Sequence, residues 1–198
     1  IVAMDNEFDE VLQKQISHPN IYYTNGYSWE NDVWNATVIK SVIEELTAIR
    51  IEHSDIETNF NQFIRDLKLA VYADGYLFKK SDSFFPRQKS PLFCVDCVPI
   101  DLPTIKKEKI EDRFTNKNLK KGTLYSFGSR YSIKTKKLIY GHLLADYCFQ
   151  IIMHYIKNRH SLKSAPKDIV FRMAINKFFK EEFNSSDVYD YYEDLFNK

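Results

Sequence analysis

Three acidic residues at alternating positions follow the first apolar stretch of the chain. Asp5, Glu7 and Asp9 come directly after residues 1–4, four apolar residues without helical spacing that predict a short buried strand. If the chain stays extended, these carboxylates share one face and crowd together. Crowded carboxylates raise one another's pKa unless a cation lies between them, and Mg²⁺ or Mn²⁺ prefers such oxygen ligands. The spacing predicts a metal site, and the alternative is that Asp9 only caps a helix over 9–16.

A fourth carboxylate is expected at the same edge of the predicted sheet. Residues 20–24 are β-branched and aromatic and predict a second short strand, after which Ser28 is a suitable N-cap for a helix containing Glu30. The carboxyl ends of parallel strands lie at one edge, where open α/β sheets bind ligands. Glu30 is therefore expected to meet Asp5 and Glu7. The helix dipole alone also favours an acid at this position, so a purely structural role stays open.

The rest of the chain predicts mainly amphipathic helices. Apolar residues recur there at spacings of three and four. The segment 138–160 is the most apolar, and His142 lies near its start. A short strand is expected within 92–100, in a proline-bearing stretch. The predicted helices cover residues 28–50, 55–73, 138–160, 164–180 and 185–197. The predicted units are a core part over 1–35, a helical hairpin insertion over 36–80, an irregular basic segment completing the core over 81–137, and C-terminal helices over 138–198.

Charge is segregated along the chain although the net charge is only +1. Residues 1–60 carry eleven acids against three bases, whereas residues 106–137 carry eleven bases against three acids. This asymmetry indicates an acidic site and a surface for a polyanion such as nucleic acid. The alternatives are that the two segments neutralise each other or that the basic segment is a solvated loop. The candidate nucleic-acid contacts are Lys120, Lys121, Arg130, Lys134, Lys136 and Lys137.

Composition narrows the class of protein further. An apolar fraction of 44% is sufficient for a packed core, and no apolar run approaches the ~20 residues of a membrane span. Three cysteines favour a reducing compartment, so a cytoplasmic location is expected. Cys94 and Cys97 form a lone C-x-x-C that we interpret as buried thiols rather than a zinc or redox site. With five glycines and no phosphate-binding loop, the chain is not expected to be an ATPase.

The acidic motifs resemble a known family. Asp5-Asn6-Glu7-Phe8-Asp9, then Glu30-Asn31, and finally Gly141-His142 before an apolar helix are similar to motifs of TOPRIM-type (topoisomerase–primase) nuclease domains of the OLD-like group. The closest resemblance is to the family that includes the nuclease subunit of PARIS anti-phage defence systems. The family has Asp where this chain has Glu7 and Lys where it has His142. The family's first strand and catalytic Glu would precede Ile1, so the chain is expected to be a fragment.

The resemblance implies an α/β fold, a TOPRIM-like (Rossmann-like) parallel sheet with flanking helices, a helical insertion and a C-terminal extension. It implies a Mg²⁺- or Mn²⁺-dependent nuclease that cleaves DNA or an RNA such as tRNA. The implied catalytic residues are Asp5, Glu7, Glu30 and His142, and the implied metal ligands are Asp5, Glu7, Asp9 and Glu30. It also implies dimerisation, an ABC-type ATPase partner, and a role in antiviral defence.

Two other classes of function remain open from the residues alone. The protein can be a non-catalytic interaction or sensor subunit bound to a partner ATPase, with the acids in structural roles. It can also be a receiver-like or phosphatase domain that uses Asp5, although the Lys and Thr/Ser constellation that such a domain needs is not found in the sequence. His142 can equally be a buried core group at the start of its helix.

Overall fold

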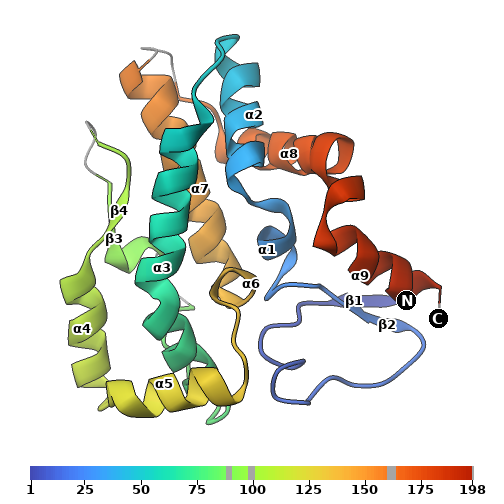
Figure 1. The fold of residues 1–198 in the computed structure, drawn as a ribbon, viewed down its shortest axis with the longest axis vertical. Coiled ribbons are helices and arrows are strands. Elements are labelled where there is room, and N and C mark those ends of the chain that lie inside the picture. Colours follow the sequence, from blue (N-terminus) through green and yellow to red (C-terminus); the bar gives the residue numbers. More distant parts are fainter. Residues whose placement is uncertain (88–90, 98–100, 160–163, 198) are drawn as a thin grey trace.

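The chain forms a mainly helical α/β structure with short strands (Figure 1). The structure is a computed structural model that describes residues 1–87, 91–97, 101–159 and 164–197. In these residues the strands form two separate two-stranded pairs. The mixed α/β class is thus confirmed, whereas the broad TOPRIM-like parallel sheet is not shown. No helix in the described part of the chain is long and apolar enough to cross a membrane.

The first strand pair is parallel, as predicted. β1 (Val2–Met4) pairs with β2 (Ile21–Tyr23), with Val2 opposite Ile21 and Met4 opposite Tyr23. Both strands therefore end at the same edge of the pair, and Asp5 follows β1 directly at that edge. The prediction that the first strand is buried is wrong, because Val2 is 52% exposed and only Met4 is partly buried. The second pair, β3 (Val95–Asp96) with β4 (Thr104–Ile105), is antiparallel and follows a 3₁₀ turn over Pro91–Cys94. The predicted strand 92–100 is thus much shorter, and residues 98–100 lie outside the described residues.

The predicted helix 28–50 is two helices, α1 (Trp29–Val33) and α2 (Ala36–Thr47). The break occurs because Asn35 adopts an extended conformation and its side chain accepts a hydrogen bond from Val38 N at 2.9 Å, which caps α2. The next helix, α3 (His53–Phe78), is longer than the predicted helix 55–73 and continues through Gly75. A Cβ at Gly75 would lie 2.8 Å from the Phe8 ring, so this glycine serves close packing rather than helix termination.

The segment 81–137, predicted to be irregular and basic, is helical from residue 107 on, whereas its described residues before 107 hold only a 3₁₀ turn and two short strands. It forms α4 (Lys107–Asn116), α5 (Lys121–Arg130) and α6 (Thr135–Leu138). Each helix buries apolar side chains, such as Phe114 of α4 and Leu124 of α5. The lysines of α4 and α5 are exposed, whereas those of α6 are partly buried. The predicted helix over 9–16 is absent, and residues 7–13 form turns.

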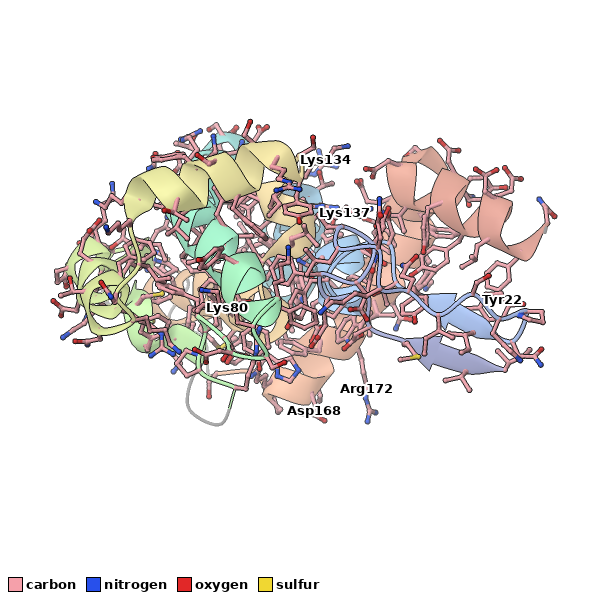
Figure 2. All side chains as sticks on the ribbon, turned by 90° about the horizontal axis from the view of Figure 1, so that it is seen from below. Tyr22, Lys80, Lys134, Lys137, Asp168 and Arg172 are labelled. Atoms are coloured by element: carbon pink, nitrogen blue, oxygen red, sulfur yellow. The ribbon has the colours of Figure 1, made fainter. Side chains whose placement is uncertain are left out.

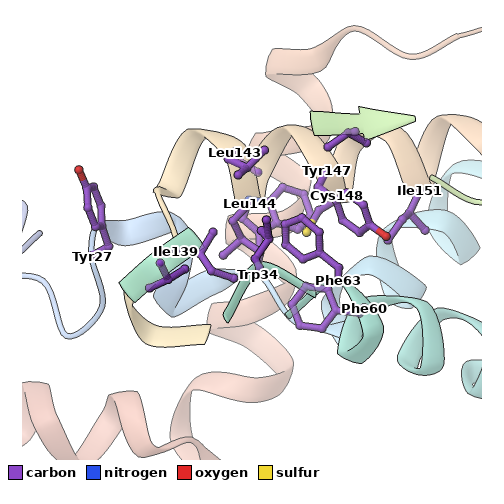
Figure 3. Close-up of a cluster of buried hydrophobic side chains, with 14 of the residues drawn as sticks. Tyr27, Trp34, Phe60, Phe63, Ile139, Leu143, Leu144, Tyr147, Cys148 and Ile151 are labelled. Carbon is purple, nitrogen blue, oxygen red and sulfur yellow. The ribbon is translucent and has the colours of Figure 1, made fainter. Parts of the chain in front are cut away.

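The core lies between α3 and α7 (Gly141–His154), which continues as a π-helical turn over Tyr155–Arg159. Figure 3 shows this cluster, in which the Phe63 and Tyr147 rings stack with centroids 3.7 Å apart. The Tyr147 hydroxyl donates a hydrogen bond to Pro103 O at 2.6 Å, which satisfies its polar end inside the core. Trp34, between α1 and α2, is also fully buried.

The C-terminal part contacts β2 through its last helix. It consists of α8 (Lys167–Lys177), a π-helical turn over Phe178–Glu182, a 3₁₀ turn over Phe183–Ser185, and α9 (Asp187–Phe196). The Tyr191 hydroxyl donates to Tyr23 O at 3.1 Å, and the Tyr22 and Phe196 rings lie 5.3 Å apart. In Figure 2 the strand pair, marked by Tyr22, and the last helix form one end of the molecule.

Candidate functional site

Backbone hydrogen bonds hold together the two segments that leave the parallel strands. Thr24 N donates to Met4 O at 3.0 Å, Asn6 N donates to the Thr24 hydroxyl at 3.0 Å, and Glu7 N donates to Tyr27 O at 2.8 Å. The parallel pairing therefore continues as a looser ladder beyond the strands. This ladder carries Asp5 into the neighbourhood of α1.

Two of the predicted acids and the predicted histidine meet at this edge. The pKa of Asp5 is raised, first by partial burial and then by the negative charge of Glu30, whereas the charge of His142 lowers it. His142 Nε2 lies 3.7 Å from Glu30 Oε1; the Glu30 side chain is 6% exposed and that of His142 is 69% exposed. Asp5, Glu30 and His142 therefore form one electrostatic group, which we call the edge triad. It is the part of the predicted site that the structure brings together.

Glu30 is held firmly within the edge triad. The Ser28 hydroxyl donates to Glu30 Oε2 at 2.5 Å, and Ser28 is the N-cap residue of α1. On the other side is Gly141, the first residue of α7, where a Cβ would lie 2.8 Å from Glu30 Oε2. The carboxylate thus lies against the N-terminal end of a 14-residue helix, where a negative charge is favoured.

The start of α7 reaches Glu30 because α1 is tied to the connection before it. The Asn31 amide donates to Lys136 O at 3.0 Å and to Ile139 O at 2.9 Å, and Tyr27 N donates to Lys137 O at 2.7 Å. His142 itself stacks on Tyr140, with ring centroids 5.4 Å apart and an interplanar angle of 11°. His142 is therefore not a buried core group. It is exposed, and its ring is held beside Glu30.

The prediction that Asp5, Glu7 and Asp9 share one face of an extended strand is wrong. The strand ends at Met4, and Glu7 has a φ of +46°, which turns the chain. The Asn6 side chain stabilises this turn, since its Oδ1 accepts from Glu10 N and from Gln15 Nε2, each at 3.0 Å. Asp9 is not a helix N-cap either, because no helix follows it.

Glu7 consequently faces a different set of side chains. It accepts a hydrogen bond from the Tyr27 hydroxyl at 3.1 Å. Burial raises its pKa, while the Tyr27 hydrogen bond and the charge of Arg87 lower it. Glu7 and Asp9 line a cavity of about 460 Å³ together with Lys14 and Arg87. The predicted metal ligands are therefore divided between the edge triad and this mixed-charge cavity.

Arg87 and Asp74 are site residues that the sequence reasoning missed. Asp74 is fully buried in α3, and Arg87 Nη2 lies 2.8 Å from its Oδ2. The Arg87 guanidinium also lies 4.2 Å from the centroid of the Tyr140 ring and 5.4 Å from that of Tyr27. Arg87 thus connects the Glu7 cavity with the aromatic support of His142. The sequence signal for Asp74 was an acid on the apolar stripe of α3, and we find none for Arg87.

The six side chains predicted to contact nucleic acid differ in exposure and in whether they form ion pairs. Lys137 lies 3.0 Å from Glu10 and Lys121 lies 2.7 Å from Glu111, so both are in ion pairs. The pKa of Lys136 is lowered because the side chain is largely buried. The other three are exposed and make no ion pair within the described part of the chain: Lys120, Arg130 and Lys134. Neutralisation between the acidic and basic segments is therefore real at Lys137, whose position beside Lys134 is visible in Figure 2.

The edge triad offers the oxygen atoms of two carboxylates and one imidazole nitrogen. Carboxylate oxygens are the ligands that Mg²⁺ and Mn²⁺ prefer, so these donors fit such an ion in kind. Within residues 1–87, 91–97, 101–159 and 164–197, however, no three His, Cys, Asp or Glu side chains are arranged as a ready-made metal cluster. The group can also support proton transfer, since an imidazole has one ring nitrogen that can donate a proton and one that can accept it. The C-x-x-C motif offers no alternative centre: Cys94 is buried as predicted, but Cys97 is exposed.

Comparison with known proteins adds no relative: no protein-family model, curated protein or solved structure matches the chain.

Proposed function

We propose that the protein is a Mg²⁺- or Mn²⁺-dependent nuclease of the TOPRIM type that hydrolyses phosphodiester bonds at the edge triad. The observation that carries the proposal is the convergence of Asp5, Glu30 and His142 where the parallel strands end, with the Glu30 charge raising the pKa of Asp5. Two anions that raise each other's energy gain most from a shared cation. The motif resemblance supports the same assignment.

Each residue of the edge triad has a separate role in this proposal. Asp5 and Glu30 hold the divalent ion, which when bound polarises a phosphoryl oxygen and offsets its charge. Ser28 and the start of α7 keep Glu30 in place through the contacts described above. His142, stacked on Tyr140, places an exposed imidazole beside the carboxylates, where it donates a proton to a leaving oxygen or offsets charge on the phosphate.

The Glu7 cavity has an auxiliary role in the proposal. Glu7 and Asp9 face Lys14 and Arg87 there, so they are not direct partners of Asp5. We assign Lys14 of this cavity to the substrate backbone next to the scissile phosphate, whereas Arg87 stays paired with Asp74. Lys120, Arg130 and Lys134 extend that contact along DNA or tRNA, because exposed cations neutralise phosphates. Homodimerisation, an ABC-type ATPase partner and a role in anti-phage defence are proposed on the motif resemblance.

The test compares cleavage of plasmid DNA and tRNA by the wild type, Asp5→Asn and Glu30→Gln in Mg²⁺ or Mn²⁺. Each variant should lose at least about 100-fold in rate, because even outer-shell partners of a metal contribute about 10–100-fold. The matched control is Asp112→Asn, an exposed acid of α4 with no ion pair among the described residues. It should cleave like the wild type.

A binding measurement separates loss of metal from loss of chemistry. Mn²⁺ should raise the Tm of the wild type and of Asp112→Asn, but not that of Asp5→Asn or Glu30→Gln, since a ligand stabilises only the state that binds it. His142→Ala should keep the Mn²⁺ shift and lose cleavage. Equal cleavage by the wild type and both carboxylate variants refutes the nuclease assignment and leaves the interaction-subunit alternative.

A further inference from the structure

His142 is the most exposed member of the edge triad, and few contacts hold its ring. Its side chain is 69% exposed, and its Nε2 lies 3.7 Å from Glu30 Oε1, which is longer than an ordinary hydrogen bond. The other close contact found in the described part of the chain is the stack on Tyr140, with ring centroids 5.4 Å apart and planes 11° apart. Because an exposed side chain can adopt several rotamers, the stack on Tyr140 decides where the imidazole lies.

The Tyr140 ring is itself held by the segments packed around it. The Tyr27 ring meets it edge-on with centroids 5.9 Å apart, and the Phe85 ring lies nearly parallel to it with centroids 6.3 Å apart. The guanidinium carbon of Arg87 lies over the ring, 4.2 Å from its centroid. A cation over a ring face is attracted by the negative charge of that face, so Arg87 is the nearest of the groups that fix Tyr140.

Arg87 is in turn anchored inside the protein. Its Nη2 lies 2.8 Å from Oδ2 of the fully buried Asp74. The other carboxylate oxygen of Asp74 accepts hydrogen bonds from the backbone N of Phe84 at 2.7 Å and of Phe85 at 3.2 Å. Nη1 of Arg87 is buried and has no hydrogen-bond partner in the described part of the chain. The guanidinium therefore makes its other contacts through its flat faces, a role that the planar group of Arg fills and the compact ammonium of Lys does not.

We propose that Arg87 and Tyr140 are positioning residues that hold the His142 imidazole at the edge triad. From the buried middle of the protein to its surface, the residues in contact are Asp74, Arg87, Tyr140 and His142. Arg87 thereby has a role in the reaction in addition to its ion pair with Asp74. The inference rests on the proposed nuclease function for the reaction that it serves, but the placement of the imidazole can be measured without any cleavage.

Proton NMR of the His142 ring tests the placement, with its imidazole C–H resonances identified by their absence in His142→Ala. In the wild type these resonances should lie upfield of those of a free histidine, because the ring current of the stacked Tyr140 shields them. Tyr140→Leu should move them to free-histidine positions, whereas Tyr140→Phe, which keeps a ring, should leave them upfield. Arg87→Lys keeps a cation for Asp74 but loses the flat group, so it should move them part of the way. Tyr125→Leu, which removes an exposed tyrosine of α5, is the matched control and should not move them.

Cleavage kinetics test the consequence for the reaction. Tyr140→Leu and Arg87→Lys should each lower kcat about tenfold or more, because a small displacement of a catalytic group can cost about 100-fold in rate. KM and the Mn²⁺ shift in Tm should stay near their wild-type values, since neither the substrate-binding cations nor the carboxylates of the edge triad are changed. Tyr140→Phe should keep most of kcat. Circular dichroism checks that each variant is folded.

Several results would overturn the positioning role. These are wild-type His142 resonances at free-histidine positions, or resonances that stay fully upfield in Tyr140→Leu or Arg87→Lys. Wild-type kcat in Tyr140→Leu, or an equal loss of kcat in Tyr125→Leu, overturns it as well. If the wild type cleaves neither DNA nor tRNA, the nuclease assignment fails, while the resonances still decide whether Arg87 and Tyr140 position His142.

Discussion

Replacing Arg87 by Gln is predicted to lower the free energy of unfolding by about 3 kcal/mol, because it removes the cation from a buried carboxylate. The Asp74 side chain is 0% exposed, that of Arg87 is 29% exposed, and their atoms lie 2.8 Å apart. Breaking a buried pair costs about 3–5 kcal/mol. The lower end applies because water reaches the vacated position and because Phe84 N still donates to Asp74 Oδ1 at 2.7 Å. The Tm should fall by about 6–12 °C for a chain of this size.

The penalty should depend on pH in a definite direction. Burial raises the pKa of Asp74 above its unfolded value, and the charge of Arg87 lowers it. A raised folded-state pKa favours folding at low pH, and this stability is lost as pH rises through the folded-state pKa. Removing Arg87 raises the pKa of Asp74 further. The difference between wild type and Arg87→Gln should therefore be largest at pH 7 and shrink as pH falls toward 4.

Urea unfolding of a double-mutant cycle measures the pair. The four proteins are wild type, Arg87→Gln, Asp74→Asn and the double variant, and the double variant should lose much less than the sum of the two single losses. Arg65→Gln, an exposed arginine on the same helix as Asp74, is the control and should change stability by less than about 0.5 kcal/mol. Additive losses in the cycle, or a pH-independent penalty, would show that Asp74 and Arg87 are not a coupled buried pair.

Two further predictions follow from packing and thiol burial. Gly141→Ala should destabilise the fold by about 1–3 kcal/mol and weaken the Mn²⁺ shift in Tm, because its Cβ would clash with the Ser28 hydroxyl and press on the Glu30 carboxylate that this hydroxyl holds. Gly122→Ala, whose Cβ would meet nothing within 4 Å, should instead be neutral or stabilising by up to about 1 kcal/mol, and equal losses in the two would refute the close-approach argument. A thiol reagent such as DTNB should label only Cys97 rapidly in the native protein, because Cys94 and Cys148 are buried and burial raises the pKa of the Cys94 thiol to about 12. Rapid labelling of all three without denaturant would contradict the burial of those two thiols.

The amphipathic helices and the first two strands could be predicted because local patterns encode them. Apolar spacing located the helix that became α3, a short apolar run without helical spacing located β1, and a run of β-branched and aromatic residues located β2. The ends of elements were less accessible. The predicted helix 55–73 stops before Gly75, whereas α3 continues through it, and the Phe8 ring, 67 residues away in sequence, packs where a side chain at Gly75 would lie. Similarly, the basic segment was expected to be irregular because it has few apolar residues. Their packing against other parts of the chain, which stabilises the helices, cannot be read from the sequence.

The sequence by itself determined that Asp5 and Glu30 would lie at one edge, since each follows a strand and the strands are parallel. Only the tertiary structure decided that Glu7 turns away toward Arg87, because that turn depends on side-chain bonds of Asn6 and on the carbonyl of Tyr27. It also decided that His142 joins the edge triad. Asn31 draws the carbonyl groups before α7 toward α1 across more than 100 residues of chain, and no local pattern encodes a contact of that separation.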